Sequence, residues 1–117
     1  MTILCSQINC FALVLEGKKR ATCWAASEGL KGAAVGKSMV ALDGKRRPRV
    51  VLTTKSLVQR QFDDVDEQFA YDEGEGDRSL AYWREAHKHY FTRLGLFEPD
   101  MQLWCERFSV EYVIERY

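Results

Sequence analysis

The sequence predicts an α+β fold in which a small mixed β-barrel has helices covering its openings. Two observations favour this fold. The expected elements follow one another as a helix, three strands, two helices and a final strand, and the strands alternate apolar and polar side chains. The chain has 117 residues, which is enough to bury one hydrophobic core. We therefore expect a single domain over residues 1–117.

The first elements are a short helix and a strand joined by a basic corner. Residues 6–16 are expected to form the helix, because their apolar side chains recur on one side. Gly17 is expected to end it, since glycine adopts the left-handed conformation without a steric penalty. A strand over about residues 21–26 then leaves the corner.

A glycine-rich loop and a charged hairpin come next. The glycines of residues 29–36 do not have the spacing of a dinucleotide fingerprint, so we interpret them as turn residues. Strands over residues 37–42 and 50–54 flank the tight-turn pair at 43–44 and form a hairpin. The tip of this hairpin carries four cations, Lys45, Arg46, Arg47 and Arg49.

Two helices are predicted after the hairpin. Asp64 is expected to cap the first, which continues to about Tyr71. The second begins near Asp77 or Ser79 and ends at Gly95. Its apolar stripe, spaced by three and four residues, consists of Leu80, Trp83, His87, Tyr90 and Leu94. The histidine of this stripe should therefore face the protein interior.

The C-terminal stretch alternates as a strand. Its expected apolar face consists of Trp104, Phe108, Val110, Tyr112 and Ile114. Glu106 falls on the same face. Because an unpaired buried charge costs on the order of several kcal/mol, Glu106 is expected to be either the structural partner of an arginine or a site residue.

The composition is that of a soluble globular protein, with 46% hydrophobic and 29% charged residues. We expect neither a signal peptide nor a transmembrane helix, because no apolar run approaches twenty residues. The four cysteines contain no C-x-x-C pair, which favours reduced thiols and a cytoplasmic location. The acidic, glycine-bearing segment 73–77 does not match a calcium loop. We expect no metal site and no cofactor.

Charge is strongly segregated along the chain although the net charge is zero. Residues 1–60 contain eleven lysines and arginines against three acidic residues, whereas residues 61–117 contain six against fourteen. This asymmetry indicates a basic face that meets an anion such as an RNA backbone or a nucleotide. The alternative is that the two halves pack together and neutralise each other.

The basic corner itself contains Lys18, Lys19, Arg20 and Thr22 within five residues. A hydroxyl three positions after a lysine is compatible with a nucleophile beside its activator. The same residue types also suit a phosphate-binding turn or a solvated loop. The corner alone does not separate these interpretations.

Two segments resemble the ASCH domain family, whose members have a PUA-like β-barrel. The first is the pattern Gly-x-Lys-x-x-Thr at residues 17–22, and the second is the long segment 70–87 that begins Ala-Tyr-Asp-Glu-Gly-Glu-Gly-Asp-Arg-Ser-Leu. Residues 103–108 are similar to the end of the longer bacterial members. The resemblance covers about residues 8–114 and implies the same fold.

The resemblance also implies a function on RNA or on modified pyrimidine nucleosides. Some bacterial members remove the acyl group of N4-acylcytidine, and the residues matching their catalytic lysine, threonine and glutamate are Lys19, Thr22 and Glu73. In this chemistry Thr22 would attack the acyl carbonyl, Lys19 would take its proton, and Glu73 would orient Lys19 or shuttle a proton. Trp24 or Tyr71 would stack on the pyrimidine.

Two alternatives remain open at this point. One is a single-stranded-RNA endoribonuclease, to which Lys19, His87 and the basic hairpin would contribute. The other is a non-catalytic RNA-binding module. The residues expected to contact nucleic acid are Lys18, Arg20, Lys45, Arg46, Arg47 and Arg49. Many family members have threonine in place of Arg20, so the corner is more basic here.

Overall fold

The computed structural model describes residues 2–4, 10–42, 45 and 47–114. Five strands form one curled sheet in the order β1-β3-β4-β5-β2, in which β1 and β3 are parallel and the other pairs are antiparallel. The elements in chain order are β1 (Thr2–Leu4), α1 (Cys10–Leu15), β2 (Ala21–Ala25), β3 (Ser38–Leu42), β4 (Pro48–Gln61), α2 (Glu67–Glu73), α3 (Leu80–Arg93) and β5 (Gln102–Val113).

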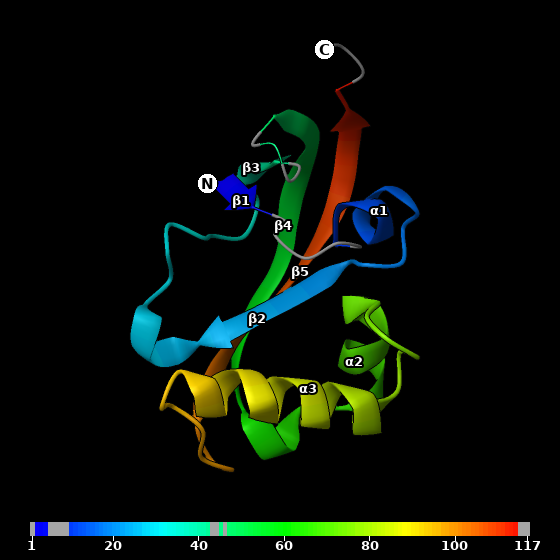
Figure 1. Ribbon diagram of the computed structural model, residues 1–117. Coiled ribbons are helices and arrows are strands. Elements are labelled where there is room, and N and C mark those ends of the chain that lie inside the picture. The colour runs from blue at the N-terminus through cyan, green and yellow to red at the C-terminus, as the bar shows by residue number, and fades with distance from the viewer. Residues whose placement is uncertain (1, 5–9, 43–44, 46, 115–117) are drawn as a thin grey trace.

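The α+β class with a curled, barrel-like sheet is confirmed. The long strands β4 and β5 run through the molecule side by side, and β2 runs antiparallel beside the first half of β5 (Figure 1). The helices α2 and α3 cover one end of the sheet, whereas β1, β3 and the hairpin end lie at the other. Two register shifts between β4 and β5 bend this pair strongly, as expected where an extra residue interrupts a ladder.

The extent of the strands differs from the expectation in two places. The strand predicted for residues 50–54 continues to Gln61, because its second half pairs with β5 up to the Gln61–Gln102 pair. This half carries exposed polar side chains, so the hydrophobic pattern does not reveal it. The short strand β1 was not predicted. Parts of the predicted helix over 6–16 and the turn at 43–44 lie outside the described residues.

The core has two parts, one on each side of the sheet. The larger part lies between the sheet and the helices α2 and α3, and the smaller part packs Val14 of α1 against β3, β4 and Phe108. Strand β5 is therefore buried on both faces near its start, with Leu103 and Cys105 facing the helices. The expected apolar face was wrong beyond Phe108, since Val110 and Tyr112 are exposed.

The helix ends follow local chemistry. Gly17 has φ = 77°, which confirms the left-handed end after α1. The expected cap at Asp64 was wrong, because Asp64 lies in a 3-10 turn and Asp66 Oδ1 accepts the Phe69 N–H at 2.8 Å instead. Helix α3 was predicted to begin near Asp77 or Ser79, and the structure selects Ser79, which caps it by accepting from the Tyr82 N–H at 3.0 Å.

The inward stripe of α3 was predicted correctly only in its first half. Trp83 is buried and His87 is largely buried, but Phe91 continues the stripe, while Tyr90 and Leu94 are exposed. A stripe with an average spacing of 3.5 residues drifts around a straight helix with 3.6 residues per turn, so the last turns present Phe91 to the core.

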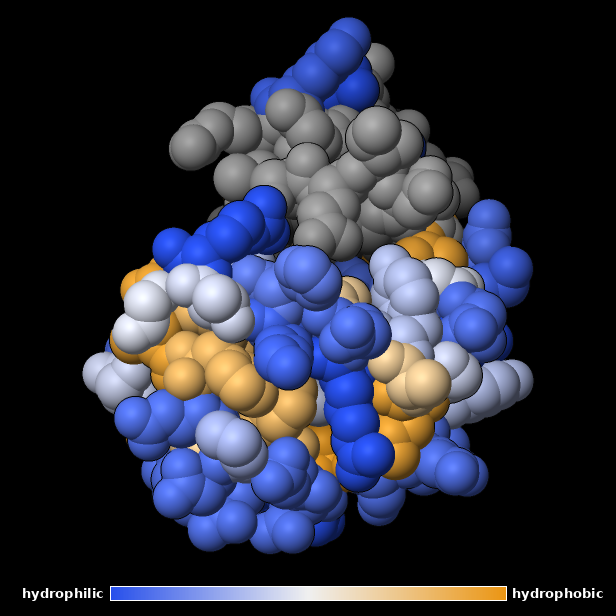
Figure 2. Space-filling view, turned by 60° about the horizontal axis from the view of Figure 1, so that its bottom comes forward, coloured by the Kyte–Doolittle hydropathy of each residue, from blue (hydrophilic) through white to orange (hydrophobic). Residues whose placement is uncertain are grey.

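The surface at the α3 end of the molecule is mixed. Figure 2 shows hydrophilic side chains interspersed with hydrophobic strips on this face. Within the described part of the chain, no helix combines the length and the apolar character needed to cross a membrane. Among the described residues, Cys23 and Cys105 are free thiols.

Candidate functional site

The site begins where the end of α2 packs on the basic corner. Gly74 ends α2 with φ = 76°, and a Cβ at this position would lie 2.5 Å from the carbonyl oxygen of Lys18. The Arg20 N–H also donates to the Asp72 carbonyl oxygen at 2.6 Å. Glycine is thus required both by the left-handed conformation and by the close approach of two backbones. This contact brings Lys19 and Glu73 together across 54 residues of sequence.

Lys19 and Glu73 form a buried ion pair. Lys19 Nζ lies 3.5 Å from Glu73 Oε1 and 3.4 Å from the Glu73 carbonyl oxygen. Glu75 Oε1 is 3.7 Å from the same nitrogen. Lys19 is 7% exposed and Glu73 is 2% exposed. Two carboxylates therefore surround one buried lysine nitrogen.

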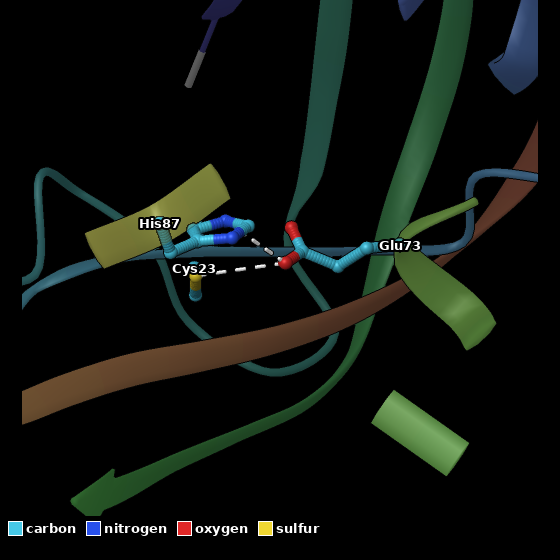
Figure 3. Close-up of side chains that lie close together, drawn as sticks. All are labelled: Cys23, Glu73 and His87. Atoms are coloured by element: carbon cyan, nitrogen blue, oxygen red, sulfur yellow. Dashed lines mark hydrogen bonds and ion pairs between the residues drawn. The ribbon is translucent and has the colours of Figure 1, made fainter. Parts of the chain in front are cut away.

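The second oxygen of Glu73 is surrounded by donors (Figure 3). His87 Nε2 lies 3.2 Å from Oε2 and Cys23 Sγ lies 3.7 Å from it. Trp83 Nε1 also donates to Oε2. His87 is fixed in turn, because its Nδ1 is 2.9 Å from the Trp83 carbonyl oxygen and its ring stacks on Trp83 at 4.3 Å between centroids. Glu73 therefore links the corner, β2 and α3.

These contacts set the protonation states. Burial raises the pKa of Glu73, but the His87 hydrogen bond and the Lys19 charge outweigh it, so that the net pKa lies below 4.5. Burial lowers the pKa of His87, but the hydrogen bond and charge of Glu73 outweigh it, so that the net pKa lies above 6.5. Glu73 is thus an anion, and His87 retains a proton to higher pH than an ordinary histidine.

Cys23 is not an activated nucleophile. Burial, followed by the Glu73 charge, raises the pKa of the Cys23 thiol well above 9.0, and burial raises the pKa of Cys105 to about 12. The ligand atoms of Cys23, Glu73 and His87 lie within 4.8 Å of one another, a distance compatible with a metal ion. However, Lys19 already neutralises this carboxylate, and a thiol with a raised pKa is a weak ligand.

Thr22 lies apart from the Lys19–Glu73 pair. Ala21, Cys23 and Ala25 of β2 face the helices, so Thr22 projects from the opposite face of the strand. Its cross-strand neighbour on β5 is Glu106.

The two aromatic residues expected to stack on a base differ in exposure. Trp24 is buried, and its Nε1 donates to the Gly29 carbonyl oxygen at 2.7 Å. Tyr71 is exposed, and the Arg78 guanidinium lies 3.6 Å from the centre of its ring. A cavity of about 430 Å³ lies beside Tyr71 and is lined by Glu67, Gln68, Tyr71, Arg78, Ser79 and Leu80.

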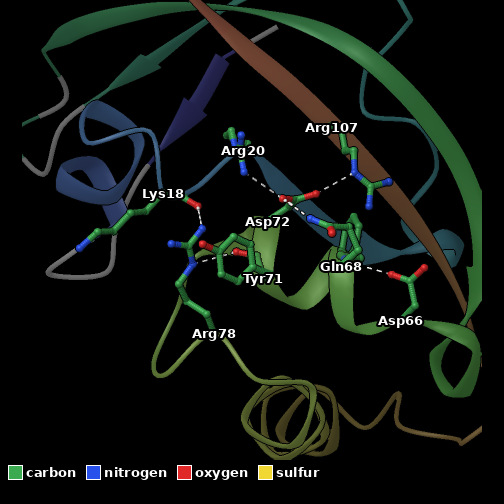
Figure 4. Close-up of polar contacts among 9 residues, drawn as sticks. Lys18, Arg20, Asp66, Gln68, Tyr71, Asp72, Arg78 and Arg107 are labelled. Carbon is green, nitrogen blue, oxygen red and sulfur yellow. Dashed lines mark hydrogen bonds and ion pairs between the residues drawn. The ribbon is translucent and has the colours of Figure 1, made fainter.

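The expected nucleic-acid contacts fall into two groups. At the corner, Lys18 and Arg20 are half exposed; Lys18 pairs with Glu16 at 3.3 Å and Arg20 with Asp72 at 3.2 Å. Asp72 also pairs with Arg107 at 3.1 Å (Figure 4). The hairpin group lies at the end of the sheet away from α2 and α3, where Lys45 and Arg47 are exposed and Arg49 is half buried. Arg46 lies outside the described residues.

Sequence reasoning missed several members of this site. The hydrogen bond from Trp83 to Glu73 and the pairing of Asp72 with Arg20 and Arg107 depend on tertiary packing. No local sequence pattern points to either contact. The inward position of His87 was visible in the helix stripe, and Glu106 was visible as a carboxylate on an apolar face. Both features indicated a polar partner without identifying it.

Comparisons with known proteins agree with this architecture. The family model described as ASCH domain matches residues 3–112. The crystal structure of an ASCH domain from Lactobacillus crispatus JV V101 is similar, with 34% identity and a TM-score of 0.81, over 93% of this chain and 79% of that chain. A protein from Enterococcus faecalis V583 has 30% identity and a TM-score of 0.71, over 86% of this chain and 66% of that chain.

A hypothetical protein with 13% identity and a TM-score of 0.68 shares the fold alone, over 93% of this chain and 96% of that chain. No curated protein matches the sequence. The family match spans nearly the whole chain and includes the corner, α2 and the start of α3. The chain therefore belongs to the ASCH domain family.

Proposed function

We propose that this protein hydrolyses the exocyclic amide of N4-acylcytidine-type nucleosides, a specific activity within the RNA-related functions of its family. The observation that carries the proposal is the buried Lys19–Glu73 pair, with 3.5 Å between Nζ and Oε1. Lysine and glutamate are rarely buried unless they are paired, and strongly perturbed ionisable groups concentrate at functional sites. This pair joins the two segments that resemble the acylcytidine hydrolases.

The residues divide the chemistry as follows. The Thr22 hydroxyl attacks the acyl carbonyl carbon and becomes transiently acylated. Lys19, paired with Glu73 and Glu75, supplies positive charge to the groups that become negative during the reaction. Glu73 orients Lys19.

The test is incubation of the purified protein with N4-acetylcytidine, with release of cytidine followed by chromatography. We expect turnover by the wild type and by Thr22→Ser, which keeps the hydroxyl. Thr22→Val, which is similar in shape but has no hydroxyl, should lose about 1,000-fold or more, as expected for loss of a nucleophile. Absence of turnover at high enzyme concentration, or full turnover by Thr22→Val, would refute the proposal.

A second candidate, binding of single-stranded RNA without chemistry, is favoured by the arginine pair on Asp72. Arg20 uses one terminal nitrogen and Arg107 uses Nε for this carboxylate, so both guanidinium groups are oriented at a partly exposed surface (Figure 4). Oriented guanidinium groups suit phosphate oxygens. RNA binding that weakens steeply with salt and yields no product would identify this function.

The same RNA assay separates the ribonuclease alternative. Cleavage of unstructured RNA that survives Thr22→Val but is lost in Lys19→Ala would identify an endoribonuclease. In that case the groups available near Lys19 for acid–base chemistry are Glu73 and the protonated His87.

A further inference from the structure

Glu106 carries a carboxylate oxygen that has no partner among the described residues. The residue is 0% exposed. Its Oε2 accepts the Thr54 hydroxyl at 2.9 Å, whereas its Oε1 is buried and makes no hydrogen bond with the described part of the chain. Buried polar atoms almost always have a partner, and leaving one unpaired costs about 1–3 kcal/mol. Such an atom requires an explanation.

The position of Glu106 supplies one. Glu106 of β5 is paired directly with Thr22 of β2, so the two side chains lie on the same face of the sheet. Residues directly opposite each other in an antiparallel pair have Cβ atoms about 4.5–5.5 Å apart. The carboxyl and the hydroxyl are therefore within reach of each other after a small side-chain adjustment.

The same face also presents aromatic surface. The next pair on this face is Trp24 with Trp104. Trp24 is buried and Trp104 is partly exposed. The hydroxyl and the carboxyl therefore lie near the partly exposed ring of Trp104, on which a pyrimidine can stack.

Lys19 does not fill the role of base for Thr22 in this arrangement. Its Nζ lies between Glu73 and Glu75, and Glu73 also contacts Cys23, which faces the helices. Lys19 Nζ thus lies on the helix side of β2, whereas Thr22 projects from the opposite face. The acceptor for the Thr22 proton must therefore come from the face on which Thr22 lies.

We propose that Glu106 is a catalytic residue whose Oε1 accepts the hydroxyl proton of Thr22 when Thr22 attacks the acyl group. The substrate in this step rests on the function proposed above. Burial raises the pKa of Glu106 above 4.5, and the Thr54 hydrogen bond lowers it in part. A carboxylate with a raised pKa is a stronger base than an ordinary one.

The steps balance as follows. Thr22 Oγ1 bonds to the acyl carbon while its proton passes to Glu106. The bond between that carbon and N4 then breaks, and the proton on Glu106 passes to N4, which leaves as the amino group of cytidine. Water attacks the Thr22 ester and gives one proton to Glu106. The ester bond breaks, Thr22 regains its proton from Glu106, and the carboxylic acid is released.

Acetylation of Thr22 by p-nitrophenyl acetate tests this step without the nucleoside. The full chain is incubated with the ester, and the acetylated peptide is located and quantified by mass spectrometry. We expect the acetyl group on Thr22, at a rate that Glu106→Gln lowers by at least about 100-fold, the usual lower size of a general-base effect. Glu98→Gln, the same change at an exposed position, should leave the rate unchanged. An equal rate in Glu106→Gln, or an unmodified Thr22 in the wild type, would overturn the proposal.

The pH dependence provides a readout that does not require Glu106→Gln to fold. The wild-type rate should rise with pH as Glu106 ionises. Thr54→Val removes the hydrogen bond that lowers the pKa of Glu106, so the midpoint should move to higher pH. The strand neighbours that face Glu106 are Thr22, Thr54 and Leu57, and none of them titrates. An unmoved midpoint in Thr54→Val would contradict the proposal.

Turnover of N4-acetylcytidine by the same preparations separates this inference from the proposed function. Acetylation of Thr22 that depends on Glu106, without release of cytidine, would reject the nucleoside substrate and retain the role of Glu106. Release of cytidine by Glu106→Gln at the wild-type rate would reject the role of Glu106 and retain the hydrolase.

Discussion

At the residue scale, the buried carboxylate of Glu73 is the central feature of the site. It accepts from Trp83 and lies close to both Lys19 and His87. A buried anion is costly unless opposite charge and hydrogen bonds compensate for lost hydration. Here they do, since the net pKa of Glu73 is lowered and that of His87 is raised. The two side chains stabilise each other's charged forms.

This coupling predicts how stability depends on pH. Because the folded pKa of His87 lies above its ordinary 6.5, its contribution is complete below pH 6.5 and is lost as pH rises through the folded value. Because the folded pKa of Glu73 lies below 4.5, its contribution is present above pH 4.5 and is lost as pH falls through the folded value. Both contributions are therefore complete between about pH 4.5 and 6.5.

The measurement is the free energy of unfolding in urea from pH 4 to 9 for the wild type and His87→Gln. The difference between them should shrink as pH rises above 6.5. His89→Gln, which removes the exposed histidine, should follow the wild-type curve. The pKa of Glu106 is raised, so its contribution to the free energy of unfolding also falls as pH rises above 4.5. This fall is the same in the wild type and both variants, so it cancels in the comparison. A difference between wild type and His87→Gln that is constant with pH would contradict the coupling.

At the element scale, α2 is a short helix whose two ends determine the site. Asp66 caps its start, and Gly74 places its end against the backbone of Lys18. Arg78, at φ = 64°, then donates to the carbonyl oxygens of Tyr71 and Lys18 at 3.0 and 3.3 Å (Figure 4). The corner and α2 therefore form one rigid unit.

Gly74→Ala tests this unit. The added Cβ would lie 2.5 Å from the Lys18 carbonyl oxygen in a left-handed conformation, so the two segments must separate. We expect a loss of about 2–3 kcal/mol in the free energy of unfolding, from strain and displaced backbone. Gly95→Ala is the matched control, since φ is 73° there but no atom lies within 4 Å of the added Cβ. Equal losses in the two variants would show that the close approach of Gly74 to the Lys18 backbone adds nothing to the cost of the substitution.

The helices and strands were largely predictable from the sequence where their side chains alternate clearly between the core and the solvent. The helix end at Gly17 and the helix start at Ser79, one of the two predicted starts, follow from local chemistry, and both were confirmed. The second half of β4 and the last turns of α3 were not predictable, since pairing with β5 and the exact helical period decide them. Asp64 was mistaken for the cap because two acidic residues with equal propensity lie two positions apart, and only tertiary structure selects Asp66.

At the scale of the whole molecule, the basic first half of the chain packs against the acidic second half. Lys19 pairs with Glu73, and Arg20 pairs with Asp72. Part of the charge asymmetry is therefore neutralised within the fold, as the sequence allowed. What remains exposed at the corner is a partly open cluster in which Arg20 and Arg107 share Asp72.

This cluster predicts weak RNA binding that depends on salt. We expect Arg20→Gln and Arg107→Gln each to reduce the slope of log K against log salt by about 1, as for the loss of one phosphate contact. Arg93→Gln, at the exposed end of α3, is the control and should leave the slope unchanged. Fluorescence anisotropy with a labelled single-stranded RNA measures this slope. Unaltered slopes in both Arg20→Gln and Arg107→Gln would show that this surface does not bind RNA.

The candidate site was predictable only in part. The sequence motif identified Lys19 and Glu73, and the structure brings them together. That Thr22 shares a face with Glu106 depends on the register between β2 and β5, which no local pattern specifies. A one-residue shift of this register would pair Thr22 with a different side chain.

The most direct test of the account is turnover of N4-acetylcytidine by the double variant Lys19→Met/Glu73→Gln. Replacing both members of a buried ion pair with neutral residues of similar size often preserves stability, so the double variant should fold. The account predicts a folded protein, by circular dichroism, whose kcat/KM falls at least about 100-fold below the wild-type value. A folded double variant that releases cytidine at the wild-type rate would show that the Lys19–Glu73 pair is structural and would contradict the account.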